Sequence, residues 1–188
     1  MATMIPTWID GILQPYEKLA AHQQGLRHKA VSVFIVAGQD ILIQQRALGK
    51  YHTPGLWANA CCTHPEWNEE ADACAIRRLD EELGVKHVMP QYCGQVEYRA
   101  DVGGGLIEHE LVEVFLVQTS LNLDITPNPD EVMATRWIKY DQLITEVAQN
   151  PNQFTPWLKI YLAEHSDLIF GGAGPRQGSQ EEKDKHND

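Results

Sequence analysis

The sequence predicts a single α+β domain in which a mixed β-sheet sandwich is flanked by helices. Apolar, β-branched segments recur along the chain, and helical segments separate them without the regular strand-helix alternation of a parallel sheet. With 188 residues, of which 43% are hydrophobic and 22% charged, the chain can bury one sizeable core and has the composition of an ordinary globular protein. One domain is therefore expected, over residues 1–170.

The first elements are a short strand around 8–13 and a short helical stretch over 16–22. A β-hairpin follows, because A-V-S-V-F-I-V-A at 30–37 is apolar and β-branched, A-G-Q-D supplies turn chemistry, and I-L-I-Q-Q-R at 41–46 resumes the strand pattern. Residues 47–65 contain prolines and glycines and show no periodicity. We expect an irregular loop there, of the kind that often carries function.

A helix is predicted from an N-cap at Asn68 to Leu83, with Gly84 as its C-terminal stop. Acidic residues occupy its first turn, where the helix dipole favours them. Its apolar residues recur at a spacing of four, which gives the helix one face for the core.

Three strands are expected in the second half, at 95–100, 106–118 and 135–138. The segment F-T-P-W then opens a last helix, because Thr155 can cap it and proline is accepted at the first helical position. This helix should run to about Ile169. Residues 171–188 have no apolar anchors, so a flexible C-terminal tail is expected there.

Charge and cysteine usage exclude several classes of function. The formal net charge of −11 argues against long contacts with nucleic acid or an anionic membrane, because both need a basic face. The four cysteines form no C-x-x-C motif, so neither a disulfide framework nor a zinc ribbon is indicated. No segment approaches the ~20 apolar residues of a membrane span. We therefore expect a cytoplasmic protein, in which a small anion can still bind locally.

Two carboxylates are candidates for chemistry. Glu108 and Glu110 project to the same face of their strand, and that face continues with the apolar residues Val112 and Val114. Ionised carboxylates on such a face need a metal, an arginine or a retained proton. The alternative is a strand end that emerges into solvent, and this pattern alone favours neither.

Three histidines and one cysteine are candidate companions of these carboxylates. His22, His28 and His64 would complete a mixed nitrogen and oxygen site suited to Mn²⁺ or Zn²⁺, although each taken singly is more often a structural residue. Cys62 lies two residues before His64 in the irregular loop. It is either a small buried hydrophobe or a thiol whose lowered pKa lets it act as an acid, base or nucleophile.

The helix over 68–83 resembles the Nudix box, in which glutamates at a helix end hold metals that grip a diphosphate. Seven positions match the pattern: Glu69, Arg77, Leu79, Glu81, Glu82, Gly84 and Val85. Two positions depart from it. Thr63 replaces the first glycine, and Arg78 replaces a glutamate that hydrolytic members use around their metals.

The surrounding segments extend the resemblance to type I isopentenyl-diphosphate isomerase, a family with a Nudix-like fold and an altered box. The resemblance runs from about His22 to Trp157 and includes Q-R-A-L-G-K, P-G-L-W-A-N, C-T-H-P, R-R-L-D-E-E-L-G, Y-R-A, E-H-E and F-T-P-W. It implies an enzyme that interconverts isopentenyl diphosphate and dimethylallyl diphosphate. It also implies a small isoprenoid diphosphate as the only partner, and a monomer or weak homodimer.

The resemblance assigns a role to each matching residue. The implied ligands of Mn²⁺ or Zn²⁺ are His22, His28, His64, Glu108 and Glu110, and Glu82 would help to hold a Mg²⁺ bound to the substrate diphosphate. The implied substrate contacts are Arg46, Lys50, Arg77 or its neighbour Arg78, and the aromatic wall Trp157. Cys62 and Glu110, with Tyr98 beside Glu110, would transfer protons on opposite sides of the substrate.

The residues do not decide which of Cys62 and Glu110 protonates the alkene. Our hypothesis is that Glu110, with Tyr98, delivers this proton. Three alternatives to the isomerase were weighed. A Nudix pyrophosphohydrolase of a nucleoside diphosphate derivative is disfavoured by Arg78 and Thr63. A thiol hydrolase built on Cys62 and His64 has little support from their spacing. A metal-binding or nucleotide-sensing module would bind without turnover.

Overall fold

The fold was obtained as a computed structural model that describes residues 3–171. The tail expected beyond Gly171 lies outside the described residues. In chain order the strands are β1 Met4–Ile9, β2 Ile12–Glu17, β3 Arg27–Ala37, β4 Asp40–Arg46, β5 Trp57–Asn59, β6 Cys61–Thr63, β7 Gln91–Gly103, β8 Leu106–Gln118 and β9 Val132–Lys139. The helices are α1 Lys18–Gln24, α2 Ala71–Leu83, α3 Tyr140–Gln149, the 3-10 turn η1 Pro151–Gln153, α4 Pro156–Glu164 and α5 Ser166–Phe170.

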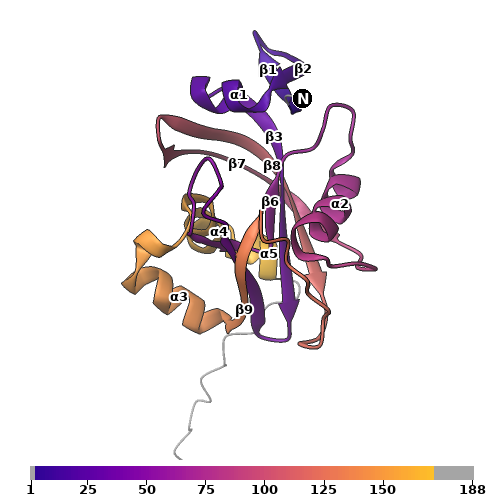
Figure 1. The fold of residues 1–188 in the computed structure, drawn as a ribbon, viewed down its shortest axis with the longest axis vertical. Helices are drawn as coiled ribbons and strands as arrows, with labels where there is room; N and C mark the ends of the chain where they lie inside the picture. Colours follow the sequence, from indigo (N-terminus) through magenta and orange to yellow (C-terminus); the bar gives the residue numbers. More distant parts are fainter. Residues whose placement is uncertain (1–2, 172–188) are drawn as a thin grey trace, which may run out of the picture.

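The centre of the sheet is the parallel pair of β3 and β8, which run side by side in Figure 1. The other pairs are antiparallel: β7 lies against β8, β6 and β4 against β3, and β9 and β5 against β4. This register places His28 of β3 directly opposite Glu110 of β8, and Glu110 opposite Tyr98 of β7. The sheet itself therefore brings together residues that are far apart in the sequence.

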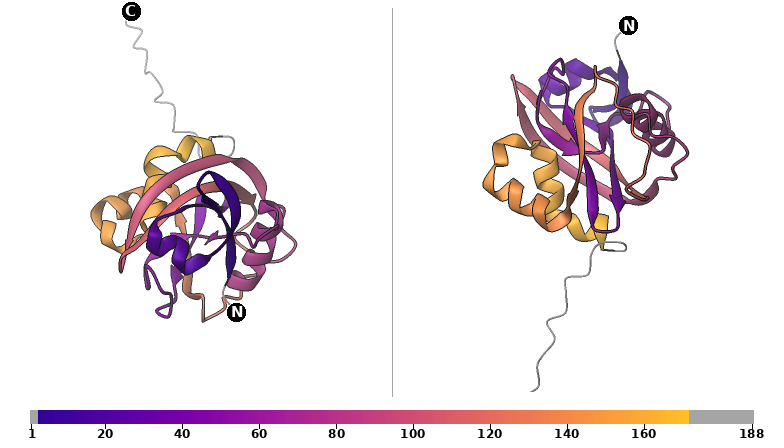
Figure 2. Two further views of the ribbon diagram at one scale, coloured as in Figure 1. Left: turned by 90° about the horizontal axis from the view of Figure 1, so that it is seen from above. Right: turned by 60° about the horizontal axis from the view of Figure 1, so that its bottom comes forward.

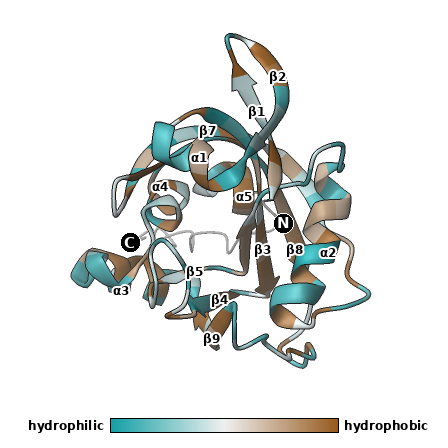
Figure 3. Cartoon of the chain, turned by 45° about the horizontal axis from the view of Figure 1, so that its top comes forward, coloured by the Kyte–Doolittle hydropathy of each residue, from teal (hydrophilic) through white to brown (hydrophobic). Residues whose placement is uncertain are grey.

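Helices cover both faces of the sheet, with α2 on one side and α3, α4 and α5 on the other (Figures 1 and 2). Because side chains alternate along a strand, β3 contributes to both faces. Val33 and Ile35 pack in the cluster under α2, whereas Phe34 packs in the cluster that includes Trp157 and Tyr161 of α4. Figure 3 shows the apolar character of β3 and β8 between these layers.

The predicted fold class is confirmed, and several elements agree closely. The hairpin is formed by β3 and β4, and the bounds of β8 are those expected. Gly84 ends α2 in the left-handed conformation, with φ of 64°. Among the helices described, none combines the length and apolar character needed to cross a membrane.

Other expectations were wrong for identifiable reasons. The strand expected around 8–13 is the middle of a hairpin, because Asp10 and Gly11 adopt positive φ and turn the chain between β1 and β2. Asn68 is not the N-cap of α2, since it has a φ of 68° and the cap is Glu70. The loop expected over 47–65 contains β5 and β6.

The C-terminal third also differs from the expectation. Helix α3 was not predicted, and the last helix is two helices, α4 and α5, separated at His165. At His165 the φ and ψ of −130° and 13° leave the helical region. Both helices still cover the same face of the sheet as the predicted single helix would.

Candidate active site

The candidate site lies on the sheet face that α4 covers, where α1 packs beside the ends of β3 and β8. Three histidines from different elements meet there: His22 of α1, His28 of β3 and His64, which follows β6. The ring centroids of His22 and His28 are 4.7 Å apart, and each lies 5.0 Å from the ring of His64. The expected convergence of these three side chains is therefore present in the structure.

Backbone contacts orient two of these rings. The Nδ1 atom of His22 lies 2.7 Å from the carbonyl oxygen of Lys18, and Nδ1 of His28 lies 2.7 Å from that of Leu26. Because a carbonyl oxygen only accepts, each Nδ1 must donate, so a neutral ring presents the lone pair of Nε2 to the site. Burial, followed by the charge of His28, lowers the pKa of His22 to about 4, which keeps its ring neutral at pH 7.

The Nε2 atom of His22 is buried and has no hydrogen-bond partner within residues 3–171. A buried lone pair without a partner is costly, unless a metal ion or a ligand completes it. Nε2 of His64 and Nε2 of His28 lie 2.9 Å and 3.5 Å from the same oxygen of Glu110. These four donor atoms lie within 4.8 Å of one another. Three imidazoles and one carboxylate fit a divalent metal such as Mn²⁺ or Zn²⁺.

Glu108 and Glu110 are both buried, with 3% and 5% of their surface exposed, so the solvent-exposed alternative is wrong. Burial and the neighbouring charge of Glu110 raise the pKa of Glu108 well above its usual range. Burial also acts to raise the pKa of Glu110, but its close contacts with the His28 and His64 rings outweigh burial and hold that pKa low. The opposite directions of these shifts favour a proton on Glu108 and the negative charge on Glu110.

Tyr98 connects the two carboxyl groups. Its hydroxyl oxygen lies 2.6 Å from Oε2 of Glu110 and 3.1 Å from Oε2 of Glu108. The hydroxyl has only one hydrogen, and the shorter contact is the one to the ionised Glu110. Protonated Glu108 can then donate to the Tyr98 oxygen. The three groups form a continuous path for a proton.

Cys62 lies in the same hollow and is held as a thiol. Its Sγ atom donates to Oδ1 of Asn59 at 2.9 Å and lies 3.0 Å from Oγ of Ser32. Asn59 is itself fixed, because its Nδ2 donates to the carbonyl oxygens of Val33 and Cys61. Burial raises the pKa of Cys62, so the lowered pKa considered from the sequence is not found. Cys61 belongs to the cluster on the opposite face of the sheet, as alternation requires.

Cationic side chains gather at the mouth of this hollow, which is partly open to solvent. Its lining includes the expected Arg46, Lys50, Glu82 and Trp157, together with Lys18, Tyr51, His52 and Arg78. Burial and the charges of Lys50 and Arg78 lower the pKa of Lys18 to about 8. Such crowding of like charges is stabilised by an anion, and a diphosphate would supply one.

Two expected residues stand apart from the histidine group. Arg77 does not line the hollow, because its guanidinium binds both carboxylate oxygens of Glu69 at 2.7 Å. Its neighbour Arg78 does line the hollow and binds Oε1 of Glu82 at 2.6 Å. Glu82 also accepts from Gln44 and is not among the grouped donors of the histidines.

His52 is a site residue that sequence reasoning missed. It lies in the loop after β4, is 7% exposed, and its Nε2 is 3.8 Å from an oxygen of Glu108. Burial, followed by the charge of Arg46, lowers the pKa of His52 to about 2. Only its place two residues after Lys50, an expected substrate contact, could have drawn attention to it. A single histidine in an irregular loop carries no other signal.

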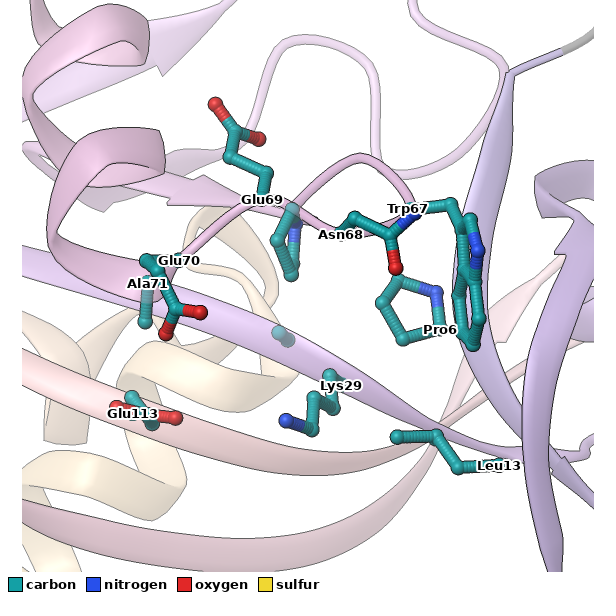
Figure 4. A pocket seen from close by; sticks show the side chains of 11 residues that line it. Pro6, Leu13, Lys29, Trp67, Asn68, Glu69, Glu70, Ala71 and Glu113 are labelled. Atoms are coloured by element: carbon teal, nitrogen blue, oxygen red, sulfur yellow. The ribbon is translucent and has the colours of Figure 1, made fainter.

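A second hollow, of about 590 Å³, lies at the N-terminal end of α2 (Figure 4). Trp67 and Pro6 form one wall, and Lys29, Glu70 and Glu113 contribute charged groups. The residues that line it include no histidine and no cysteine. It therefore lacks the convergent donors of the first hollow.

Comparison with known proteins decides the family. The NUDIX domain family matches residues 26–158 of the chain. The chain is 60% identical over 171 residues to the isopentenyl-diphosphate Delta-isomerase of Roseobacter denitrificans, covering 91% of this chain and 97% of that protein. The chain belongs to the isopentenyl-diphosphate Delta-isomerase family. A further member, from Ruegeria pomeroyi, is also 60% identical and covers 91% of this chain and 95% of its own length.

Solved structures of other proteins share the fold of this chain. A MutT NUDIX hydrolase from Burkholderia pseudomallei superposes with a TM-score of 0.57 at 23% identity, covering 72% of this chain and 95% of its own. A Deinococcus radiodurans protein superposes with a TM-score of 0.63 at 13% identity, covering 78% and 90%. At such identities the likeness shows the fold alone. The family resemblance and the fold predicted from the sequence are both confirmed.

Proposed function

We propose that the protein interconverts isopentenyl diphosphate and dimethylallyl diphosphate in isoprenoid biosynthesis. The observation that carries this proposal is the shared hollow of Cys62 and the Tyr98–Glu110 pair. Moving the double bond requires one proton to be added to the terminal methylene and another to be removed from the methylene on the other side of the branched alkene carbon. Two proton-transfer groups must therefore reach one short apolar chain, and the hollow supplies both.

The cationic mouth would bind the substrate diphosphate. Lys18, Arg46, Lys50 and Arg78 line it. Nε of Arg46 is buried and has no hydrogen-bond partner among the described residues, so an anion would satisfy an unfilled donor. We assign the expected contribution of the arginine pair to Arg78, because Arg78 lines the hollow and Arg77 does not. Glu82 lies against Arg78 and can help to hold a Mg²⁺ carried in by the diphosphate.

A divalent metal would be held by His22, His28, His64 and Glu110, with Glu108 beside them. The unpartnered lone pair of His22 is the observation that fits such an ion. When bound, Mn²⁺ or Zn²⁺ would neutralise the buried charge and bias the proton affinity of the carboxyl groups. The two histidine rings are already oriented for it by backbone carbonyls.

In the proposed reaction, the proton path through Glu108, Tyr98 and Glu110 delivers a proton to the terminal methylene. Cys62, in its ionised form, takes a proton from the methylene on the other side of the branched carbon, and Oδ1 of Asn59 then accepts a hydrogen bond from the new S–H as it does in the structure. In the reverse direction the roles exchange. The thiol form, which the raised pKa of Cys62 favours, is the state that follows this removal of a proton.

The tertiary cation between these two steps must be protected from water. Trp157 lines the hollow and is 1% exposed, and Tyr98 is 8% exposed. Their ring faces can stabilise a cation, and their bulk excludes water. The guanidinium of Arg46 lies 5.2 Å from the Trp157 ring and keeps the diphosphate end separate from the apolar end.

Loss of turnover in matched variants tests the proposal. Cys62→Ser and Glu110→Gln should abolish isomerisation of isopentenyl diphosphate, whereas Cys93→Ser, which changes a half-buried thiol of β7, should retain it. Near-normal turnover in either of the first two variants would overturn the proton-transfer pair. Release of phosphate without isomerisation would favour the pyrophosphohydrolase instead.

The working state proposed is a cytoplasmic monomer or weak homodimer without nucleic-acid or membrane partners. The formal net charge of −11 supports the expected lack of nucleic-acid and anionic-membrane partners. Light scattering over a range of protein concentrations measures the oligomeric state, and a stable higher oligomer would contradict it.

A further inference from the structure

His52 lies beside the metal donors but belongs to none of the roles described so far. A second group of donor atoms, from His22, His52 and Glu108, lies within 4.8 Å of one another and shares His22 with the first group. All three side chains are buried. Glu108, a ligand expected from the sequence, is therefore grouped with His52 and not with His28 or His64.

The orientation of His52 points one nitrogen at this group. Its Nδ1 lies 3.2 Å from Oγ1 of Thr53, so Nε2 is the atom that faces Glu108 at 3.8 Å. The His52 ring is stacked on His22, with centroids 5.8 Å apart and an interplanar angle of 20°. A separation of 3.8 Å is too long for a hydrogen bond, and it leaves room for an ion to join Nε2 and the carboxylate.

The loop around His52 fixes this orientation. Nη2 of Arg46 donates to the His52 carbonyl oxygen at 3.2 Å, and the edge of Trp157 lies against the ring at a centroid distance of 5.9 Å. Thr53 has a φ of 46°, a conformation that non-glycine residues rarely adopt. A strained backbone conformation therefore lies directly after His52 in this loop.

We propose that His52 is a fourth imidazole ligand of the metal centre. Together with His22 and Glu108 it provides two nitrogen donors and one oxygen donor, beside the group of His28, His64 and Glu110 that shares His22. Nitrogen-rich sites favour Zn²⁺ and other later transition metals over Mg²⁺ and Mn²⁺. His52 therefore sets the metal preference of this protein. The inference rests on the metal site of the proposed function.

Metal binding, measured apart from activity, tests this inference. Titrations of the metal-free full chain with Zn²⁺ and with Mn²⁺ should show that His52→Gln weakens Zn²⁺ more than Mn²⁺, with a loss in Zn²⁺ affinity of ~10–100-fold or more. His165→Gln, which changes a histidine at the end of α4, is the control and should leave both affinities unchanged. Unchanged Zn²⁺ affinity in His52→Gln would overturn the inference.

A second variant tests ligation through a new absorption band, so this test does not depend on a loss of metal affinity. With Co²⁺ bound, His52→Cys should gain a thiolate-to-metal charge-transfer band that the wild-type protein lacks, because the new sulfur replaces a ligand nitrogen. A Co²⁺-loaded His52→Cys protein without the band would contradict ligation. If His28→Gln has no effect on Zn²⁺ affinity, the proposed metal site itself is wrong. If His28→Gln weakens Zn²⁺ binding and His52→Gln does not, only this inference is refuted.

Discussion

Replacing Tyr98 by phenylalanine removes the one hydroxyl group that joins the two buried carboxyl groups. The hydroxyl lies 2.6 Å from Glu110 and 3.1 Å from Glu108, and the side chain stays buried in the same core cluster as Trp157. The ring itself is retained, so packing changes little. A hydrogen bond to a charged group contributes ~1.5–3 kcal/mol. If the bond acts in the transition state, its loss lowers the rate by ~10–150-fold.

We expect Tyr98→Phe to lower kcat by ~10–150-fold without a comparable rise in KM, because the cationic mouth that binds the diphosphate is intact. Initial rates of isomerisation, followed by NMR over a range of substrate concentrations, separate the two constants. Tyr92→Phe is the matched control, since the Tyr92 side chain is 57% exposed and lies on the same strand. An unchanged kcat together with a lowered free energy of unfolding would refute the proton path and leave Tyr98 a structural role.

Three further predictions follow from the helix α2. Arg78→Ala should raise KM by ~10-fold, about 1.4 kcal/mol, whereas Arg77→Ala should leave KM unchanged and lower the melting temperature; steady-state kinetics and thermal unfolding distinguish the two, and equal KM effects would contradict the assignment. Leu79→Ala should reduce the free energy of unfolding by ~2–5 kcal/mol in urea titrations because the side chain is fully buried, and a negligible loss would contradict the packing described. Hydrogen bonds from Arg77 lower the pKa of Glu69 below its ordinary 4.5, so its contribution to stability is present above that pH and lost as the pH falls through the folded pKa. The stability difference between wild type and Glu69→Gln should accordingly shrink in urea titrations below about pH 4.5, and a difference that is constant with pH would refute the linkage.

Local patterns were sufficient to predict much of the sheet and half of the site. Strict alternation in β8 places Glu108 and Glu110 on one face, and the structure buries both. The A-G-Q-D turn between β3 and β4 was identified by its own residues. The D-G pair at 10–11 is an equally local turn signal, and it divides the single strand expected around 8–13 into the hairpin of β1 and β2.

Contacts between distant segments could not be predicted from local patterns. His22 reaches His28 because α1 packs on the sheet, and no spacing in the sequence encodes that packing. His52 lies in an irregular loop with a positive φ at Thr53, and no local sequence pattern predicts that conformation. The sequence alone could have favoured Arg78 over Arg77 as the substrate contact, since Arg78 lies one helical turn from the buried Glu82.

The most direct test of the central claim is the fate of isopentenyl diphosphate in deuterated water with the purified, metal-loaded protein. The account predicts dimethylallyl diphosphate with solvent deuterium in the methyl group that was the terminal methylene, because the proton delivered there comes from exchangeable groups. Phosphate release without a shift of the double bond would contradict it, and so would dimethylallyl diphosphate that carries no deuterium.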